Sequence, residues 1–218
     1  MTDLKVKEIK KIEYERPPIR RGYANQTLYV NLSDSTIASK PVSEKMKQTF
    51  TGGKGFDLWL LWNAVNSRTR WNSPENALCI ACGPLGGTPT YPGSGKSIVS
   101  AISPTTGSAM DSNVGGFFGP YLKFSGFDAL EIQGKTNVPT VIFVDGITRQ
   151  VQLLEVSGLP EGAHEISEVL TEYFGQGKPR NISDYPAEMD ALNATRARSS
   201  TWTHSTYICA AQTLTGHS

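Results

Sequence analysis

The sequence predicts an α+β fold in which β-sheet predominates and a few helices accompany it. Short runs rich in β-branched and aromatic residues alternate with clusters of turn-forming residues along most of the chain. Only four short segments have the spacing or composition of helices, and no pattern recurs at a fixed period. With 218 residues, 38% of them hydrophobic, the chain is long enough for one moderately large domain with a real core.

Composition excludes several classes of function. The formal net charge is +1, whereas a dedicated binder of nucleic acid or of an acidic membrane normally carries a basic surplus. No run of the sequence approaches the ~18 apolar residues of a transmembrane helix. The basic N-terminus has no apolar core, so it is not a secretory signal. We therefore expect a cytoplasmic protein that engages neither nucleic acid nor membrane.

The first elements follow from local patterns. Residues 1–21 alternate Lys, Glu and Ile, and we expect a basic arm that is mobile or contacts another subunit. Alternation of apolar and polar residues predicts a strand over 26–32. Ser43 is a suitable N-cap for a short helix that reaches Lys47. A second helix, over 56–65, is so apolar that we expect it to be buried on most sides.

The middle of the chain is rich in glycine. Of the 21 glycines, 14 lie between Gly52 and Gly134, and residues 83–119 consist mostly of turn formers. Irregular stretches of this length within a compact domain are usually functional. Within and around it we expect two strands, at 77–82 and 97–102.

The later elements are more regular. They are a short helix within 117–124, a strand at 129–133, a hairpin of 140–144 and 150–156, and a helix over 163–174 that Gly175 ends. From residue 184 to 218 the composition changes, because Ala, Ser and Thr supply 16 of the 35 residues and no apolar period is sustained. We expect the domain to span 22–183 and to be followed by an unrelated, weakly structured tail; a shifted reading frame or a truncated gene would explain it.

Two motifs suggest chemistry that the local pattern does not support. Cys79 and Cys82 form a C-x-x-C, but in an extended strand they point to opposite faces, which favours buried structural thiols over a redox pair or metal site. Residues 92–97 (PGSGKS) resemble a phosphate-binding loop. The full pattern requires glycine where Thr90 stands, and a strand rather than a helix follows. What remains is a flexible, amide-rich turn with one cation.

Six blocks of sequence point to a single family. They are 50–55 (FTGGKG), 73–76 (SPEN), 82–88 (CGPLGGT), 103–107 (SPTTG), 113–119 (NVGGFFG) and 122–128 (LKFSGFD). In this order and spacing they resemble the N-terminal domain of the tungsten-containing aldehyde ferredoxin oxidoreductases, including relatives that reduce aromatic acyl-CoA esters of the class II benzoyl-CoA reductase type. The resemblance runs from about residue 22 to 183, with the rest of such an enzyme missing.

The resemblance implies a largely β-sheet domain on which a tungsten (or molybdenum) ion held by two pterin cofactors rests. It implies oxidation of an aldehyde to a carboxylic acid, with electrons passing through a [4Fe-4S] cluster to ferredoxin or another electron-transfer subunit. The ligands of that cluster belong to later domains and are absent here. Asn113 and Gly115 fall on the loop that contacts pterin, and Lys96 stands where well-known members carry Arg.

The residues themselves agree with such a site. Glycines such as Gly95 and Gly115 let backbone N–H groups approach a large polar ring, and Asn113 offers both a donor and an acceptor. Lys96 supplies positive charge, although it lacks the planar fork of Arg. Three functions are to be separated: an oxidoreductase domain that is inactive alone, a noncatalytic truncated scaffold, and a nucleotide-binding loop at Lys96. A small aldehyde and an acyl-CoA ester both stand as candidate substrates, and no catalytic residue or metal ligand is assigned to this chain.

Overall fold

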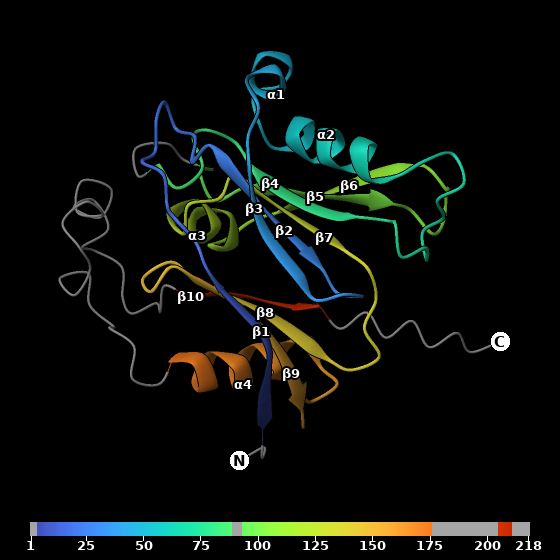
Figure 1. Ribbon diagram of the computed structural model, residues 1–218, viewed down its shortest axis with the longest axis vertical. Helices are drawn as coiled ribbons and strands as arrows, with labels where there is room; N and C mark the ends of the chain where they lie inside the picture. Colours follow the sequence, from blue (N-terminus) through green and yellow to red (C-terminus); the bar gives the residue numbers. More distant parts are fainter. Residues whose placement is uncertain (1–3, 89–92, 176–204, 211–218) are drawn as a thin grey trace.

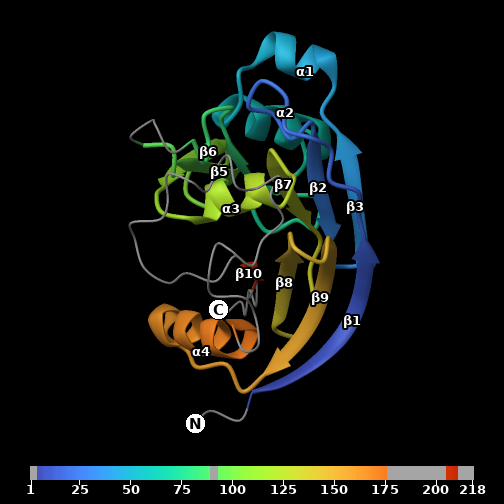
Figure 2. The same cartoon turned by 90° about the vertical axis from the view of Figure 1, so that its left-hand side faces the viewer.

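The computed structural model describes residues 4–88 and 93–175, and the backbone of 205–210. Two β-sheets lie one above the other, with helices on their outer faces and one short helix beside the space between them (Figures 1 and 2). This arrangement confirms the predicted α+β class with β-sheet predominant. None of the helices in the described residues is long and apolar enough to cross a bilayer.

The larger sheet has six strands in the order β3-β2-β7-β4-β5-β6. Neighbouring strands are antiparallel except β2 and β7, which are parallel. The strands are β2 (Gln26–Asn31), β3 (Thr36–Pro41), β4 (Leu78–Cys82), β5 (Ser97–Ile102), β6 (Ala109–Val114) and β7 (Ala129–Gln133). The smaller sheet, in the order β1-β9-β8-β10, is antiparallel throughout. It consists of β1 (Lys5–Glu13), β8 (Thr140–Asp145), β9 (Gln150–Ser157) and β10 (Ser205–Ala210).

Three apolar layers hold these sheets and helices together. The first lies between the sheets, the second joins the six-stranded sheet to α1 (Glu44–Thr49) and α2 (Lys54–Ala64), and the third joins the smaller sheet to α4 (Ala163–Gly175). Strand alternation serves two layers at once, because Ile80 faces the other sheet while its neighbours Cys79 and Ala81 face the helices. A further helix, α3 (Phe118–Phe124), lies near the sheet-to-sheet layer (Figure 2).

The structure corrects the expectation for helix α2. Its inner face is buried through Phe56, Leu60 and Leu61, but Trp62 is 83% exposed. The helix covers one face of the six-stranded sheet and turns its other side to solvent. Ser43 caps the preceding helix as expected, since its Oγ accepts a hydrogen bond from the Met46 N–H at 3.1 Å.

Residues 5–13 form a sheet strand where a mobile arm or subunit contact was expected. A β-bulge between Glu8 and Lys10 interrupts the alternation, so Val6 packs with the α4 layer while Ile12 packs between the sheets. Lysines flank both residues, so the sequence shows no continuous alternation of apolar and polar residues over this strand. This is why the strand was missed.

Two further expectations need correction. Strand β6 lies within the stretch that was expected to be irregular apart from the strand at 97–102, and all six of its residues are exposed. Without a buried face the strand shows no apolar alternation. In the tail, residues 205–210 form β10, which pairs with β8; the remaining tail residues lie outside the described part of the chain.

Candidate cofactor surface

Strands β5 and β6 bring the predicted site residues to one end of their ladder. Ser97 lies opposite Val114, so Lys96 and Gly115 meet just beyond the last paired residues, with Asn113 one position inside. The Nζ atom of Lys96 lies 3.7 Å from the position that a Cβ on Gly115 would occupy. A hairpin ladder thus unites residues that are far apart in the sequence.

Gly95 completes this group through a close backbone approach. A Cβ at Gly95 would lie 2.4 Å from the carbonyl oxygen of Gly116, a distance that real side chains do not tolerate. Only glycine fits without a shift of the backbone. All four residues predicted at the cofactor surface, Gly95, Lys96, Asn113 and Gly115, therefore lie at the same end of the β5–β6 pair.

The loops around this group expose backbone rather than side chains. Gly93 and Gly116 have φ values of 89° and 94°, and no atom lies within 4 Å of a Cβ built on either. The N–H of Lys96 donates to the Gly93 carbonyl at 3.1 Å, which closes a tight turn. Turns of this kind leave N–H groups accessible to a polar or anionic ligand.

A tungsten-pterin group fits the chemistry of this surface. No larger side chain fits at Gly95, while Gly115 and Gly116 leave their backbone open, and an exposed cation and an exposed amide stand beside them. In the described part of the chain, the Lys96 and Asn113 side chains form no hydrogen bond or ion pair. They are available to a ligand.

Apolar side chains flank the same loop. Val114 and Phe117 bracket the two central glycines in sequence and are 36% and 48% exposed. Exposed apolar groups beside a polar cradle are typical of a surface that a large ligand or another domain covers. The hydroxyl of Ser97, by contrast, is buried and has no hydrogen-bond partner among the described residues.

Asp57 is a buried carboxyl that sequence reasoning did not single out. Ser100 Oγ donates to its Oδ2 at 3.3 Å, and its Oδ1 has no partner among the described residues. Burial raises the pKa of Asp57 to about 8; the bond from Ser100 opposes this shift and the charge of Asp111 adds to it. Asp57 is therefore mainly a neutral acid at pH 7. The one available signal was a single carboxyl within the apolar run 56–62 (FDLWLLW).

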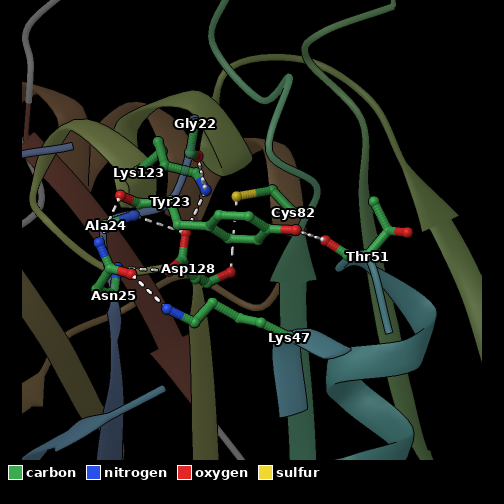
Figure 3. Close-up of polar contacts among 9 residues, drawn as sticks. All are labelled: Gly22, Tyr23, Ala24, Asn25, Lys47, Thr51, Cys82, Lys123 and Asp128. Atoms are coloured by element: carbon green, nitrogen blue, oxygen red, sulfur yellow. Dashed lines mark hydrogen bonds and ion pairs between the residues drawn. The ribbon is translucent and has the colours of Figure 1, made fainter. Parts of the chain in front are cut away.

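The sequence block that ends in Asp128 takes part in a buried network of hydrogen bonds and an ion pair (Figure 3). The buried Lys123 ammonium forms an ion pair with the Asp128 carboxylate and also donates to the Gly22 carbonyl at 2.9 Å. The same carboxylate accepts the N–H groups of Ala24 at 3.0 Å and Asn25 at 2.8 Å. These bonds fix the segment that enters β2.

The two strand cysteines are free and buried. Cys79 packs under the helices, while Cys82 Sγ donates to the Asp128 carbonyl at 3.6 Å (Figure 3). Burial raises the pKa of the Cys82 thiol to about 11, with the positive charge of Lys123 opposing the shift, and burial likewise raises that of Cys79. Neutral thiols are poor nucleophiles and metal ligands. The structure therefore agrees with the interpretation of Cys79 and Cys82 as buried structural thiols rather than a redox pair or metal site.

The loop that resembles a phosphate-binding motif leads into a strand. Residues 97–102 form β5, whereas a phosphate-binding loop of that type needs a helix at this place. The rejection of a nucleotide hydrolase at Lys96 therefore agrees with the fold.

Comparison with known proteins gives the same family as the sequence blocks. The profile of the aldehyde ferredoxin oxidoreductase N-terminal domain matches residues 27–183. The chain is 39% identical over 124 residues to the tungsten-containing aldehyde ferredoxin oxidoreductase of Pyrococcus horikoshii. This aligned stretch covers 57% of this chain and 20% of that protein. It is 32% identical over 134 residues to the aliphatic sulfonate oxidoreductase, WOR-like subunit, of Pyrococcus furiosus, covering 60% of this chain and 21% of that one.

A solved structure also matches. The active site complex BamBC of benzoyl coenzyme A reductase, in complex with 1,5-dienoyl-CoA, superposes with a TM-score of 0.64 and 28% identity, over 72% of this chain and 24% of that one. The chain spans about a fifth of the length of the sequence relatives. Since the family profile covers well over half of the chain, the protein belongs to the aldehyde ferredoxin oxidoreductase family, whose N-terminal domain it carries.

Proposed function

We propose that residues 22–183 form the tungstopterin-binding base of an oxidoreductase that oxidises aldehydes to carboxylic acids with ferredoxin as electron acceptor. The convergence of Gly95, Lys96, Asn113 and Gly115 at the end of the β5–β6 ladder carries this proposal. Family membership supports it, because the relatives are tungsten-containing enzymes.

Each residue has a distinct part in this proposal. The N–H groups around Gly95 and Gly115 would face the pterin, and the Asn113 amide would offer it both a donor and an acceptor. Lys96 offsets the negative charge of phosphate or dithiolene groups. When bound, the tungsten centre supplies the two-electron chemistry. We expect residues 22–183 on their own to be inactive, because the resemblance implies that other domains of such enzymes provide the cluster and the rest of the cofactor site.

Metal and pterin analysis of the anaerobically purified chain tests the proposal. We expect tungsten or molybdenum together with a pterin fluorescence signal. Lys96→Ala should lower both by about tenfold or more, because one charge-assisted contact is worth about 1.5–3 kcal/mol. Lys135→Ala removes another exposed positive charge, outside the proposed cofactor surface, and should change neither signal. A well-folded chain that holds neither metal nor pterin favours the noncatalytic scaffold and overturns the proposal.

A second candidate is a part of an aromatic acyl-CoA reductase. The match to the benzoyl coenzyme A reductase complex, at 28% identity over 72% of the chain, favours it. Both candidates use the same surface, and they differ in the substrate that the complete enzyme accepts. Viologen reduction that depends on an aldehyde would support the first, and viologen oxidation that depends on an aromatic acyl-CoA would support the second. Robust turnover by this chain alone would contradict its expected inactivity.

We also propose that the part of the chain that resembles the family ends near residue 183 and that 184–218 is an unrelated tail, of which residues 205–210 pair with β8. The change in composition at that point supports this boundary. Limited proteolysis should cut after residue 183 before it cuts within the sheets. Uniform resistance of the whole chain would contradict the boundary.

A further inference from the structure

An open pocket of about 940 Å³ lies beside the entry to β2, and the proposed cofactor surface does not use it. Its walls come from two stretches of chain, the segment that precedes β2 and the segment that runs from the end of β3 into α1. The lining residues are Pro17, Pro18, Arg20, Arg21, Tyr23, Asn25, Pro41, Val42, Glu44, Lys47 and Gln48.

The lining carries an excess of positive charge. Lys47 is already paired, because its Nζ lies 2.6 Å from Glu44 Oε1 and donates to Asn25 Oδ1 at 3.1 Å. Arg20 and Arg21 are exposed, and within the described residues their guanidinium groups form no ion pair or hydrogen bond. Two uncompensated guanidinium groups therefore border the pocket.

A tight turn holds these two arginines. The Arg20 N–H donates to the Tyr23 carbonyl at 2.9 Å, and the Tyr23 N–H returns a bond to the Arg20 carbonyl at 3.0 Å. Between them Arg21 and Gly22 have φ values of 53° and 82°. Both central residues thus lie in the left-handed region, which for Arg costs about 1–2 kcal/mol. Such a conformation persists only where the surroundings enforce it.

The surroundings enforce it through contacts with distant segments of the chain (Figure 3). The Gly22 carbonyl accepts a bond from Lys123, and a Cβ at Gly22 would lie 2.2 Å from the Pro84 oxygen. The Tyr23 hydroxyl donates to the Thr51 carbonyl at 2.7 Å. The arginines therefore project from a rigid platform, and a rigid platform lowers the ordering cost of binding.

We propose that this pocket binds a phosphate-bearing organic anion of nucleotide size. Planar guanidinium forks match phosphate oxygens in charge and geometry. The prolines and Val42 supply apolar wall for the organic part of the ligand. The volume falls at the upper end of the range of small-molecule sites, roughly 300–1,000 Å³, and exceeds the needs of a single phosphate.

Calorimetric titration of the 218-residue chain with ADP, pyrophosphate and adenosine tests the proposal. We expect ADP to bind more tightly than pyrophosphate and adenosine not to bind measurably. The double variant Arg20→Gln/Arg21→Asn should weaken ADP binding at least about tenfold, since it removes two charge-assisted contacts. Asn is chosen at position 21 because it tolerates a left-handed backbone. Arg20→Gln alone should give a smaller loss and serves if the double variant does not fold.

The matched control is Arg68→Gln/Arg70→Gln, which removes the same charge from exposed positions outside the pocket. It should bind ADP as the unchanged chain does. Lys96→Ala should also bind normally, which separates this site from the cofactor surface. The proposal is overturned if neither ADP nor pyrophosphate binds, if adenosine binds as well as ADP, or if the Arg20 and Arg21 variants bind like the unchanged chain.

Discussion

Lys123 and Asp128 form an ion pair at opposite ends of the turn that follows α3, with side chains 2% and 0% exposed to solvent. This pair forms hydrogen bonds with Gly22, Ala24 and Asn25. It thereby connects the end of α3 to the start of β2, which lies far from α3 in the sequence. A local sequence block thus sets the position of a distant turn.

Removing the cation from this pair should destabilise the fold strongly. Lys123→Met leaves the Asp128 carboxylate buried without its countercharge, and such a change costs about 3–5 kcal/mol. Urea unfolding followed by circular dichroism measures the loss. Lys135→Met, at an exposed position, should change the free energy of unfolding by less than about 0.5 kcal/mol. Equal stabilities of the two variants would contradict the role assigned to the pair.

Gly95 and Gly83 should respond differently to a methyl group. In Gly95→Ala the new Cβ meets the Gly116 oxygen, so the turn must shift, at a cost of about 1–3 kcal/mol. Gly83 has open space around its Cβ position and no positive φ, so Gly83→Ala should be nearly neutral. Thermal unfolding of both variants checks this. An unchanged melting temperature of Gly95→Ala would contradict the close approach of the Gly95 backbone to the Gly116 carbonyl oxygen.

Asp57 should make stability depend on pH. Its pKa rises from 3.8 to about 8 on folding, so between these values the folded chain holds a proton that the unfolded chain has lost. Stability therefore falls as pH rises through this window, with a slope that approaches about 1.4 kcal/mol per pH unit. Asp57→Asn removes this contribution. Urea unfolding of both proteins at several pH values between about 5 and about 8 should show the flatter profile for the variant.

Glu131 provides the internal check for that experiment. Burial raises its pKa too, against the opposing charge of Lys40, so it adds a slope of the same sign in both proteins. The difference between the two profiles isolates Asp57. Parallel profiles would show that Asp57 ionises normally in the folded chain.

The strand thiols should be unreactive in the folded protein. Cys79 and Cys82 are buried and their pKa values are raised, which leaves little thiolate near neutral pH. In a Cys209→Ser background, an aromatic disulfide reagent should react at least about a hundredfold more slowly before denaturation than after it. Rapid labelling of the folded chain would contradict the burial of this pair.

Strands with apolar runs were predictable from the sequence. The strand expected at 26–32 is β2, and the expected hairpin is β8 and β9. Strand β8 is buried at every position, and β9 alternates buried and half-buried residues over part of its length, so apolar composition rather than a strict period of two identified them. Strand β1 was not predictable because its bulge exchanges the buried face halfway along. Strand β6 has no buried face to leave a pattern.

The candidate site was predictable only in part. The resemblance nominated Lys96 and Asn113, but the register that joins their strands came from the fold. The carboxyl of Asp57 and the partners of Lys123 depend on contacts between distant segments. Composition and spacing carry no information about such pairs, because a buried charge looks like any other charge in a sequence.

The pairing of β1 with β9 has a consequence for the order of events during synthesis. Lys5 lies opposite Ser157, so β1 leaves the ribosome well before β9, the strand with which it pairs, has been synthesised. Until then its backbone is unpaired, and its lysines keep it hydrated and repel other nascent chains. The lysines that hide the strand pattern in the sequence therefore also protect β1 from aggregation before β9 is synthesised.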